Sequence, residues 1–182
     1  MNKIKLIYIS DEKGLIGIKE GNHWEQPFYL PKDLAHFHKM TSANIVVIGR
    51  ETFNAMNNKP LPYRTNIVMT KQSDYEHLDK SGTINICHSV NGLFKRIDHL
   101  KADIYILGGA NIYEQFLDLA DEIIHTCVHT DYSEHSYGEF KYFNPDLSQF
   151  SLENKTEVIK NKDAITGKEF EFTISTYKRS IY

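Results

Sequence analysis

Short apolar runs rich in valine and isoleucine recur along this chain, and most are followed by a segment with helical spacing. The runs are typical of buried strands and occupy 4–10, 44–49, 65–71, 83–90, 103–109 and 121–130. Helical spacing is found in 32–41, 50–56, 92–100 and 110–120. This alternation restricts the chain to a mainly parallel sheet, because each helix must cross a face of the sheet to reach the next parallel strand.

The last part of the chain follows a different pattern. Two runs, 155–161 and 169–177, flank Thr166-Gly167 and predict a closing antiparallel hairpin. Segment 131–151 is polar and lacks periodicity, so we expect a loop there, and we expect another loop around Gly14, Gly17 and Gly21.

The fold class that follows is α/β. We predict a mainly parallel mixed sheet of about eight strands, with helices on both faces and an antiparallel C-terminal hairpin. The 182 residues contain no repeat, low-complexity segment or linker, so we expect a single domain over residues 1–182.

Composition excludes several classes of function. The net charge of −3 gives no basic excess for nucleic acid or an anionic membrane, and the apolar N-terminal run is too short for a membrane span or a signal peptide. Cys87 and Cys127 are two widely spaced cysteines and are expected to be small buried thiols. We therefore expect a cytoplasmic protein that binds neither nucleic acid nor a membrane.

Glycine, hydroxyl and basic residues gather where predicted strands end. Gly108 and Gly109 close one strand before a helix, and Gly49 does the same before Arg50 and Thr52. A third strand ends in Thr70 and Lys71. Each feature alone also fits a tight turn or a solvated surface charge. Together they predict a phosphorylated dinucleotide at the carboxyl edge of the sheet, and the two basic residues favour NADPH over NADH.

Asp33 is an acidic residue in a segment that otherwise looks suited to burial. A helix-start acid on the surface is the simpler interpretation, because carboxylates are favourable in the first turn of a helix. However, Phe37 follows at i+4 and shares its helix face, with Leu30 and Leu34 close by. A carboxylate in such a wall is suited to bind paired N–H donors of a planar heterocycle, and burial would perturb its pKa.

The order of these motifs resembles dihydrofolate reductase. The matching pieces are "LIYISDEKGLIG", Trp24, "LPKDLAHF", "VVIGRETF", "PLPYRTNIVMTK", "CHSV", "IYILGGANIYEQFL", "IIHTCV" and the final hairpin. They cover nearly the whole chain in the family's order, and they are specific as a set although no single piece is.

The resemblance implies a folate site. Asp33 would hold the pterin, Thr126 would support that acid, and Trp24 would help to order an active-site water; these three are the implied catalytic residues. Arg64 would pair with the glutamate α-carboxylate of folate, a task suited to its bidentate fork. The other implied substrate-binding residues are Ile7, Tyr8, Leu34, Phe37, Met56, Leu61, Leu107 and Tyr113.

The resemblance also implies NADPH as cofactor. The implied cofactor-binding residues are Ile9, Leu15, Ile16, Gly17, Gly49, Arg50, Glu51, Thr52, Met69, Thr70, Lys71, His88, Gly108, Gly109, Ala110, Asn111, Ile112, Tyr113 and Gln115. The loop 15–21 would close over the site. The implied reaction is hydride transfer from NADPH to C6 of 7,8-dihydrofolate, with N5 protonated through water, by a monomer that antifolates inhibit.

Four positions depart from the family's pattern. The segment between Trp24 and Asp33 is longer than usual, Glu139 stands where aspartate is common, and Glu51 and Asn111 make the phosphate region less basic. We therefore expect altered closure of the first loop.

Three alternatives remain. A pyrimidine reductase of riboflavin synthesis is disfavoured by Asp33 together with Arg64, and a non-catalytic binding protein by retention of Asp33, Thr126 and Arg64. His125 and His129 raise the question of a metal site, but i and i+4 on a strand are too far apart for ligands, so we expect none.

Overall fold

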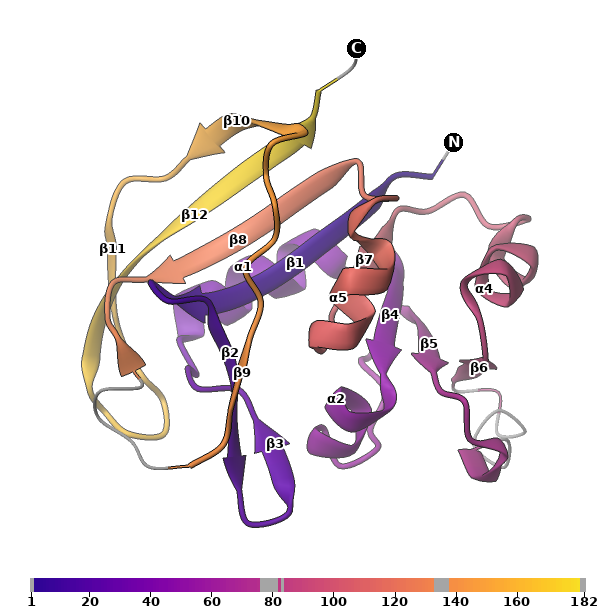
Figure 1. Ribbon diagram of the computed structural model, residues 1–182, viewed down its shortest axis with the longest axis horizontal. Helices are drawn as coiled ribbons and strands as arrows, with labels where there is room; N and C mark the ends of the chain where they lie inside the picture. The colour runs from indigo at the N-terminus through magenta and orange to yellow at the C-terminus, as the bar shows by residue number, and fades with distance from the viewer. Residues whose placement is uncertain (1, 76–81, 83, 133–137, 181–182) are drawn as a thin grey trace.

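A nine-stranded mixed sheet forms the centre of the protein. The computed structural model describes residues 2–75, 82, 84–132 and 138–180. The strand order is β10-β12-β8-β1-β7-β4-β5-β6, with β11 paired to β12 (Figure 1). The strands are β1 (Ile4–Asp11), β4 (Ile45–Gly49), β5 (Thr65–Met69), β6 (Asn85–Cys87), β7 (Ile104–Ile106), β8 (Glu122–Val128), β10 (Phe150–Lys155), β11 (Ile159–Lys162) and β12 (Glu169–Arg179).

The strand directions confirm the predicted fold class. All pairings among β8, β1, β7, β4, β5 and β6 are parallel, whereas β12 runs antiparallel to β8, β10 and β11. The carboxyl ends of the parallel strands therefore meet at one edge of the sheet, where open α/β sheets bind ligands.

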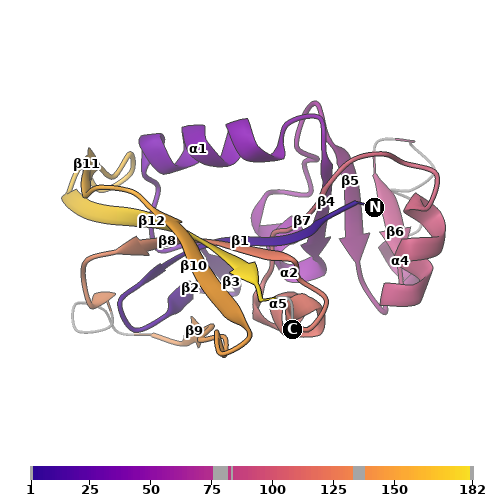
Figure 2. The ribbon, with the colours of Figure 1, turned by 90° about the horizontal axis from the view of Figure 1, so that it is seen from above.

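Helices cover both faces of the sheet, as predicted. They are α1 (Pro31–Thr41), α2 (Arg50–Ala55), α4 (Val90–Ile97) and α5 (Ala110–Leu117), with a short 3₁₀ turn at Ser73–Tyr75. Figure 2 shows α1 on one side of the sheet and α5 on the other.

Two apolar clusters reflect the alternation of side chains along each strand. Ile7 and Ile9 of β1 pack in the cluster on the α1 side, whereas Leu6 and Tyr8 pack with α4 and α5 on the other side. Because successive residues of a strand point to opposite faces, neighbours in the sequence contribute to different cores.

A second, three-stranded sheet replaces much of the loop structure expected from the sequence. Its order is β3 (His23–Glu25), β2 (Leu15–Glu20) and β9 (Phe140–Tyr142). The prediction of loops around Gly14, Gly17 and Gly21 and over 131–151 was therefore wrong in part. The physical reason is that β3 and β9 are three residues long, too short for periodicity to show, and β2 and β9 pair across more than a hundred residues. The exposed edge strand β10 was missed because its residues do not alternate in burial.

The two cysteines lie far apart. Cys87 ends β6 and is buried, while Cys127 in β8 is half-buried. Four strands separate β6 from β8 in the sheet, and at about 4.8 Å per strand no disulfide can join them. Within the described residues, no helix is both long and apolar enough to cross a membrane.

Candidate active site

Asp33 and Thr126 are in direct contact although they lie 93 residues apart in the sequence. Pro31 opens α1, where its missing N–H costs little, and places Asp33 in the first turn. On β8, Thr126 points to the α1 side because Ile124 and Val128, two residues away on either side, pack in the same cluster as α1. The Thr126 hydroxyl donates to Asp33 Oδ1 over 2.5 Å.

Burial controls the charge of this acid. Desolvation raises the pKa of Asp33 above the ordinary carboxyl value, while the hydrogen bond from Thr126 partly opposes that rise. Since Thr126 occupies one oxygen, the remaining acceptor positions of the carboxylate are left for a ligand with paired N–H donors.

Apolar residues predicted to bind substrate lie on the same side of the sheet as this acid, the α1 side. Ile7 belongs to the buried cluster there, and Phe37, Met56, Leu61 and Leu107 pack against it. Leu34 is 54% exposed, which leaves its side chain available to a ligand rather than committed to the core.

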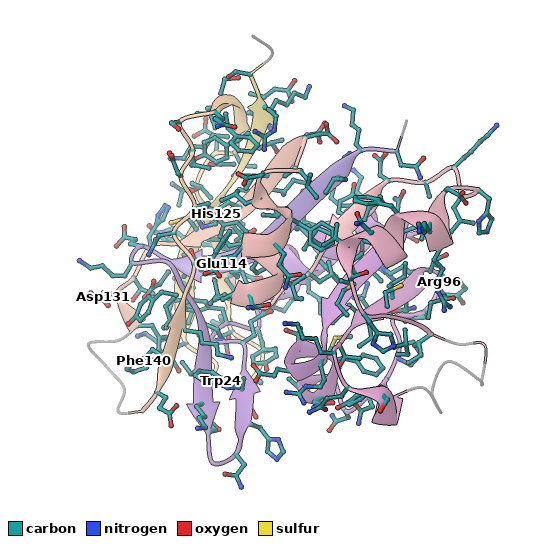
Figure 3. All side chains as sticks on the ribbon, turned by 45° about the vertical axis from the view of Figure 1, so that its right-hand side comes forward. Trp24, Arg96, Glu114, His125, Asp131 and Phe140 are labelled. Carbon is teal, nitrogen blue, oxygen red and sulfur yellow. The ribbon has the colours of Figure 1, made fainter. Side chains whose placement is uncertain are left out.

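Tyr8 is placed differently from the other predicted substrate residues. Its ring lies on the opposite face, stacked on His125 at a centroid distance of 4.5 Å and packed edge-on against Phe143. The side chain of Tyr8, which was predicted to bind substrate, therefore lies on the face away from Ile7, because consecutive strand residues face opposite ways. Burial lowers the pKa of His125 to about 4, and its Nε2 lies 2.8 Å from the Ser10 hydroxyl, so His125 is a neutral core residue (Figure 3).

Glycines let two strand ends approach each other at the predicted cofactor site. The Gly49 N–H donates to the Gly108 carbonyl over 2.6 Å. A Cβ on Gly49 would lie 2.7 Å from Ile112 Cγ1, and one on Gly108, whose φ is +90°, would lie 2.5 Å from the Tyr113 ring. Only glycine fits at these two positions, which are buried, so the ends of β4 and β7 pack closely against each other and against the start of α5, where Gly109 and Ala110 reach the surface.

The residues around this surface have the chemistry of a phosphate site. Gly109 lies beside the Thr52 hydroxyl, which is 3.4 Å from the position of a Cβ there. Helix α5 begins at Ala110; the Ile112 and Tyr113 N–H groups donate to the Gly109 carbonyl, which leaves the first N–H groups of the helix to face a ligand. Asn111 and Gln115 are exposed and hydrogen-bonded to each other over 2.6 Å.

Strands β5 and β6 extend the same edge. The Thr70 carbonyl accepts a hydrogen bond from His88 Nδ1 over 2.7 Å, and the Thr70 hydroxyl accepts from the Gln72 N–H. Met69 ends β5 in the core, whereas Lys71 is exposed and Arg50 is half-exposed at the start of α2. These residues, all predicted to bind the cofactor, therefore lie at the neighbouring ends of β4, β5 and β6.

Arg64 is held in place by its surroundings. Its Nε donates to the Thr41 hydroxyl over 2.9 Å and its Nη1 to the Pro62 carbonyl over 2.6 Å. Nη2 lies 2.9 Å from His38 Nδ1, and the guanidinium carbon is 5.8 Å from the centre of the Phe37 ring. Burial lowers the pKa of Arg64 from its usual value. The five N–H groups of arginine leave donor capacity on Nη1 for a carboxylate.

Tyr113, predicted for both ligands, bridges the two halves of the site. Its hydroxyl donates to the Ile7 carbonyl over 3.0 Å, and its ring is buried against Gly108. Burial raises the pKa of Tyr113 well above the phenolic value, which keeps it a neutral donor.

The segment predicted to close over the site is an ordered hairpin. Leu15, Ile16 and Gly17 lie in β2, which pairs with β3 on one side and β9 on the other. Glu139 accepts from the Lys19 N–H through its carbonyl, and its carboxylate pairs with Lys19 Nζ at 2.8 Å. Glu139 thus braces this hairpin despite the departure from aspartate.

Two functional positions were missed by the sequence analysis. Asp11 is 1% exposed, and its carboxylate accepts from the N–H groups of Lys13, Leu15 and Tyr132. It therefore fixes where β2 begins. The sequence feature that could have identified Asp11 is its place at the end of a strand, three residues before the turn glycine Gly14.

Asp163 is the second. It is buried and accepts from the N–H groups of Tyr29, Ile165 and Thr166. Asp163 anchors the long segment between Trp24 and Asp33, where Phe28 is fully buried. In this segment Pro27 and Phe28 are buried, whereas Gln26 and Tyr29 are exposed.

Within the described residues, no group of three or more histidine, cysteine, aspartate or glutamate side chains is placed to hold a metal ion. The site therefore consists of one buried acid, an anchored guanidinium and a glycine-lined strand edge.

Comparisons with known proteins identify the family of this chain. The family model described as dihydrofolate reductase matches residues 3–179. The dihydrofolate reductase of Enterococcus faecium is 31% identical over 158 residues, which are 86% of this chain and 87% of that protein. The dihydrofolate reductase of Bacillus subtilis (strain 168) is 31% identical over 180 residues, which are 97% and 96% of the two chains.

A solved structure supports the same assignment. The dihydrofolate reductase from Enterococcus faecalis, complexed with NADP(H) and RAB-propyl, superimposes with a TM-score of 0.77 at 28% identity. The match covers 98% of this chain and 97% of that one. This chain belongs to the dihydrofolate reductase family.

Proposed function

We propose that this chain reduces 7,8-dihydrofolate to tetrahydrofolate with NADPH and so supplies one-carbon and thymidylate metabolism. The observation that carries the proposal is the buried Asp33, hydrogen-bonded by Thr126 in an apolar wall at the sheet edge that also carries the glycine-lined surface. Within the part of the chain that the structure describes, no ion pair is formed by this desolvated carboxylate, and a polar heterocycle with N–H donors would satisfy it.

Asp33 would bind the pterin through the 2-amino group and N3. Its raised pKa shows that the carboxylate is poorly solvated, so ligand N–H donors would replace water that the site withholds. Phe37, Met56 and Leu61 would pack against the ring faces, and Arg64 would take the glutamate α-carboxylate. The negative charge of Asp33 would favour protonation of N5 by a water molecule that Trp24 helps to order.

The residues at the strand ends fit NADPH. The start of α5, where Gly109 lies beside the Thr52 hydroxyl, suits a pyrophosphate lying on the first backbone N–H groups of the helix. Arg50 and Lys71 would meet the additional phosphate. When bound, NADPH supplies the hydride; the protein contributes orientation and exclusion of water. Antifolates that present a cationic heterocycle would compete at Asp33.

The remaining expectations extend this proposal. We propose a monomeric enzyme formed as a single domain over residues 1–182, in which one chain would supply every residue of the proposed site. Two thiols too far apart to pair are compatible with the reducing cytoplasm, where we place the protein.

Loss of NADPH absorbance with purified protein and dihydrofolate tests the proposal, with NADH run in parallel. Rapid oxidation of NADPH with at least tenfold slower oxidation of NADH is the expected result. Absence of turnover together with absence of binding of either ligand would refute it.

A further inference from the structure

Arg64, which the proposed function assigns to the glutamate tail, has most of its donors occupied within the chain. Its Nε donates to the Thr41 hydroxyl and its Nη1 to the Pro62 carbonyl. Both acceptors of Nη2 belong to His38, which offers the ring nitrogen Nδ1 at 2.9 Å and the backbone carbonyl at 3.3 Å. A guanidinium carries five N–H groups, so these four bonds leave one N–H, on Nη1, for a ligand.

A two-point grip on a carboxylate needs more than this single N–H of Arg64. Arginine binds carboxylates most strongly through parallel bonds from two of its nitrogens. Its Nε is committed to Thr41, which is fully buried and whose hydroxyl donates in turn to the Phe37 carbonyl. The second N–H must therefore come from Nη2, which can supply it only by leaving the ring nitrogen of His38.

The charge of His38 decides whether its ring can hold Nη2. Arginine has donors and no acceptor, so Nδ1 carries no proton in this contact and the ring is neutral. A protonated imidazole has an N–H on both ring nitrogens and can no longer accept from Arg64. It also places a second positive charge beside the guanidinium, which repels the ring from Arg64 and attracts an anion.

No nearby acid holds His38 in its charged form. The side chain is exposed in the last turn of α1, with its ring 5.7 Å from that of Phe37. The charged neighbours are Arg64, from the segment before β5, and Lys39 of α1 itself; the same segment also carries the phenol of Tyr63, which is 87% exposed. Among the residues that the structure describes, no acidic side chain forms an ion pair with His38.

We propose that His38 determines how strongly this site holds the glutamate tail, by retaining or releasing Nη2 of Arg64. Neutral His38 competes with the α-carboxylate for Nη2, whereas protonated His38 releases Nη2 for a second bond to that carboxylate. Histidine is the side chain that ordinarily changes charge between about pH 5 and pH 8, so the preference for the α-carboxylate increases as the pH falls through this range. This role rests on the proposed function, in which Arg64 takes the glutamate α-carboxylate.

Two ligands that differ at one group isolate the effect of His38. The pair is 7,8-dihydrofolate and its α-amide, in which a neutral carboxamide replaces the α-carboxylate. The measured quantity is the ratio of their dissociation constants, α-amide over dihydrofolate, at about pH 8 and about pH 6. Both ligands carry the same pterin, so titration of Asp33, whose pKa burial raises, affects both constants alike and cancels in the ratio.

We expect the ratio for the parent to rise about threefold to tenfold from the higher to the lower pH. This is the gain from one additional charge-assisted hydrogen bond, at the low end of its range because Arg64 is partly exposed.

Two substitutions at His38 reproduce separately the states that pH interconverts. His38→Asn keeps an acceptor near the position of Nδ1 that acid does not remove, so its ratio should stay close to that of the parent at the higher pH. His38→Leu has no acceptor for Nη2, so its ratio should exceed that of the parent at the higher pH by about threefold or more and should not vary with pH. As a control, His99→Asn removes an exposed histidine that follows α4 and should reproduce the parent.

Three results would overturn the proposal. The first is a ratio for the parent that does not change with pH. The second is a ratio for His38→Asn that still rises as the pH falls. The third is a ratio for His99→Asn that no longer rises, because the effect would then not belong to His38.

NMR of the unliganded protein measures the same contact without any folate. The two N–H signals of Arg64 Nη2 should be separate in the parent at about pH 8 and averaged at about pH 6, and separate at both in His38→Asn. If the parent binds neither dihydrofolate nor NADPH, the proposed function is wrong, and the NMR series still decides whether His38 controls Nη2. If the parent reduces dihydrofolate but its ratio is independent of pH, the role of His38 alone is refuted.

Discussion

Removal of the Thr126 hydroxyl would test the central contact of the site. Thr126→Val keeps the shape of a residue that is 3% exposed and deletes only the donor to Asp33 Oδ1. Two consequences follow. The ionised carboxylate loses a short, charge-assisted hydrogen bond, and the pKa of Asp33 rises further because this bond is what opposes desolvation.

The magnitude follows from the nature of the bond. A hydrogen bond to a charged group contributes about 1.5–3 kcal/mol, and Asp33 is poorly solvated, so water replaces the lost donor incompletely. If binding and reduction require the ionised acid, kcat/KM for dihydrofolate near neutral pH should fall about tenfold to a hundredfold. In the plot of kcat/KM against pH, the rise that reports ionisation of Asp33 should move to higher pH in Thr126→Val. The difference in kcat/KM between the variant and the parent should therefore become smaller as the pH rises.

The assay is kcat/KM measured across the pH range for the parent, Thr126→Val and Thr126→Ser. Serine keeps the hydroxyl and should stay within about threefold of the parent, which separates the hydrogen bond from packing. NADPH affinity, measured by fluorescence, should be unchanged in all three. A Thr126→Val profile that superimposes on the parent would show that the hydrogen bond does not control the acid.

Three further outcomes are expected. Asp33→Asn should lower kcat at least about a hundredfold, measured as turnover. It should also raise the melting temperature at neutral pH, because burial raises the pKa of the Asp33 carboxyl and the parent therefore loses stability as the pH rises from the unfolded-state pKa to the folded-state pKa, whereas the variant does not; calorimetry at several pH values checks this. Arg64→Leu should weaken dihydrofolate about thirtyfold and NADPH less than about twofold; equal weakening by titration calorimetry would contradict its assignment to the glutamate carboxylate. His125→Gln should reduce the amount by which the free energy of unfolding falls between about pH 6.5 and pH 4. The reason is that burial lowers the pKa of His125 to about 4, so on acidification the histidine is protonated in the unfolded chain before it is protonated in the folded one; an acid-unfolding curve identical to that of the parent would contradict this.

The sheet and the acid could be predicted because local patterns specify them. The runs at 45–49 and 104–106 are apolar on both faces, as parallel strands covered by helices must be, and Pro31 with Asp33 marks the start of α1. The glycines at 49 and 108 could be read as strand ends for the same reason. These features depend on residues that are neighbours in the sequence.

The three-stranded sheet could not be predicted in this way. Strand β9 has three residues and forms a strand only because it pairs with β2, more than a hundred residues away. Lys141 therefore looked like an ordinary loop charge, and Glu51 looked like a misfit near a phosphate. Their ion pair exists because the fold brings β9 beside α2.

The sequence by itself determined the α/β class, the helix that presents Asp33 and the glycines at the strand ends, since these follow from the spacing of apolar residues and the conformational range of glycine. Only the tertiary structure decided that Thr126 meets Asp33, that the Tyr8 ring turns away from the site, and that Lys141 joins Trp24 to Glu51. The physical reason is that each of these contacts depends on strand register and on which face a side chain takes. Both are set by pairing between distant segments.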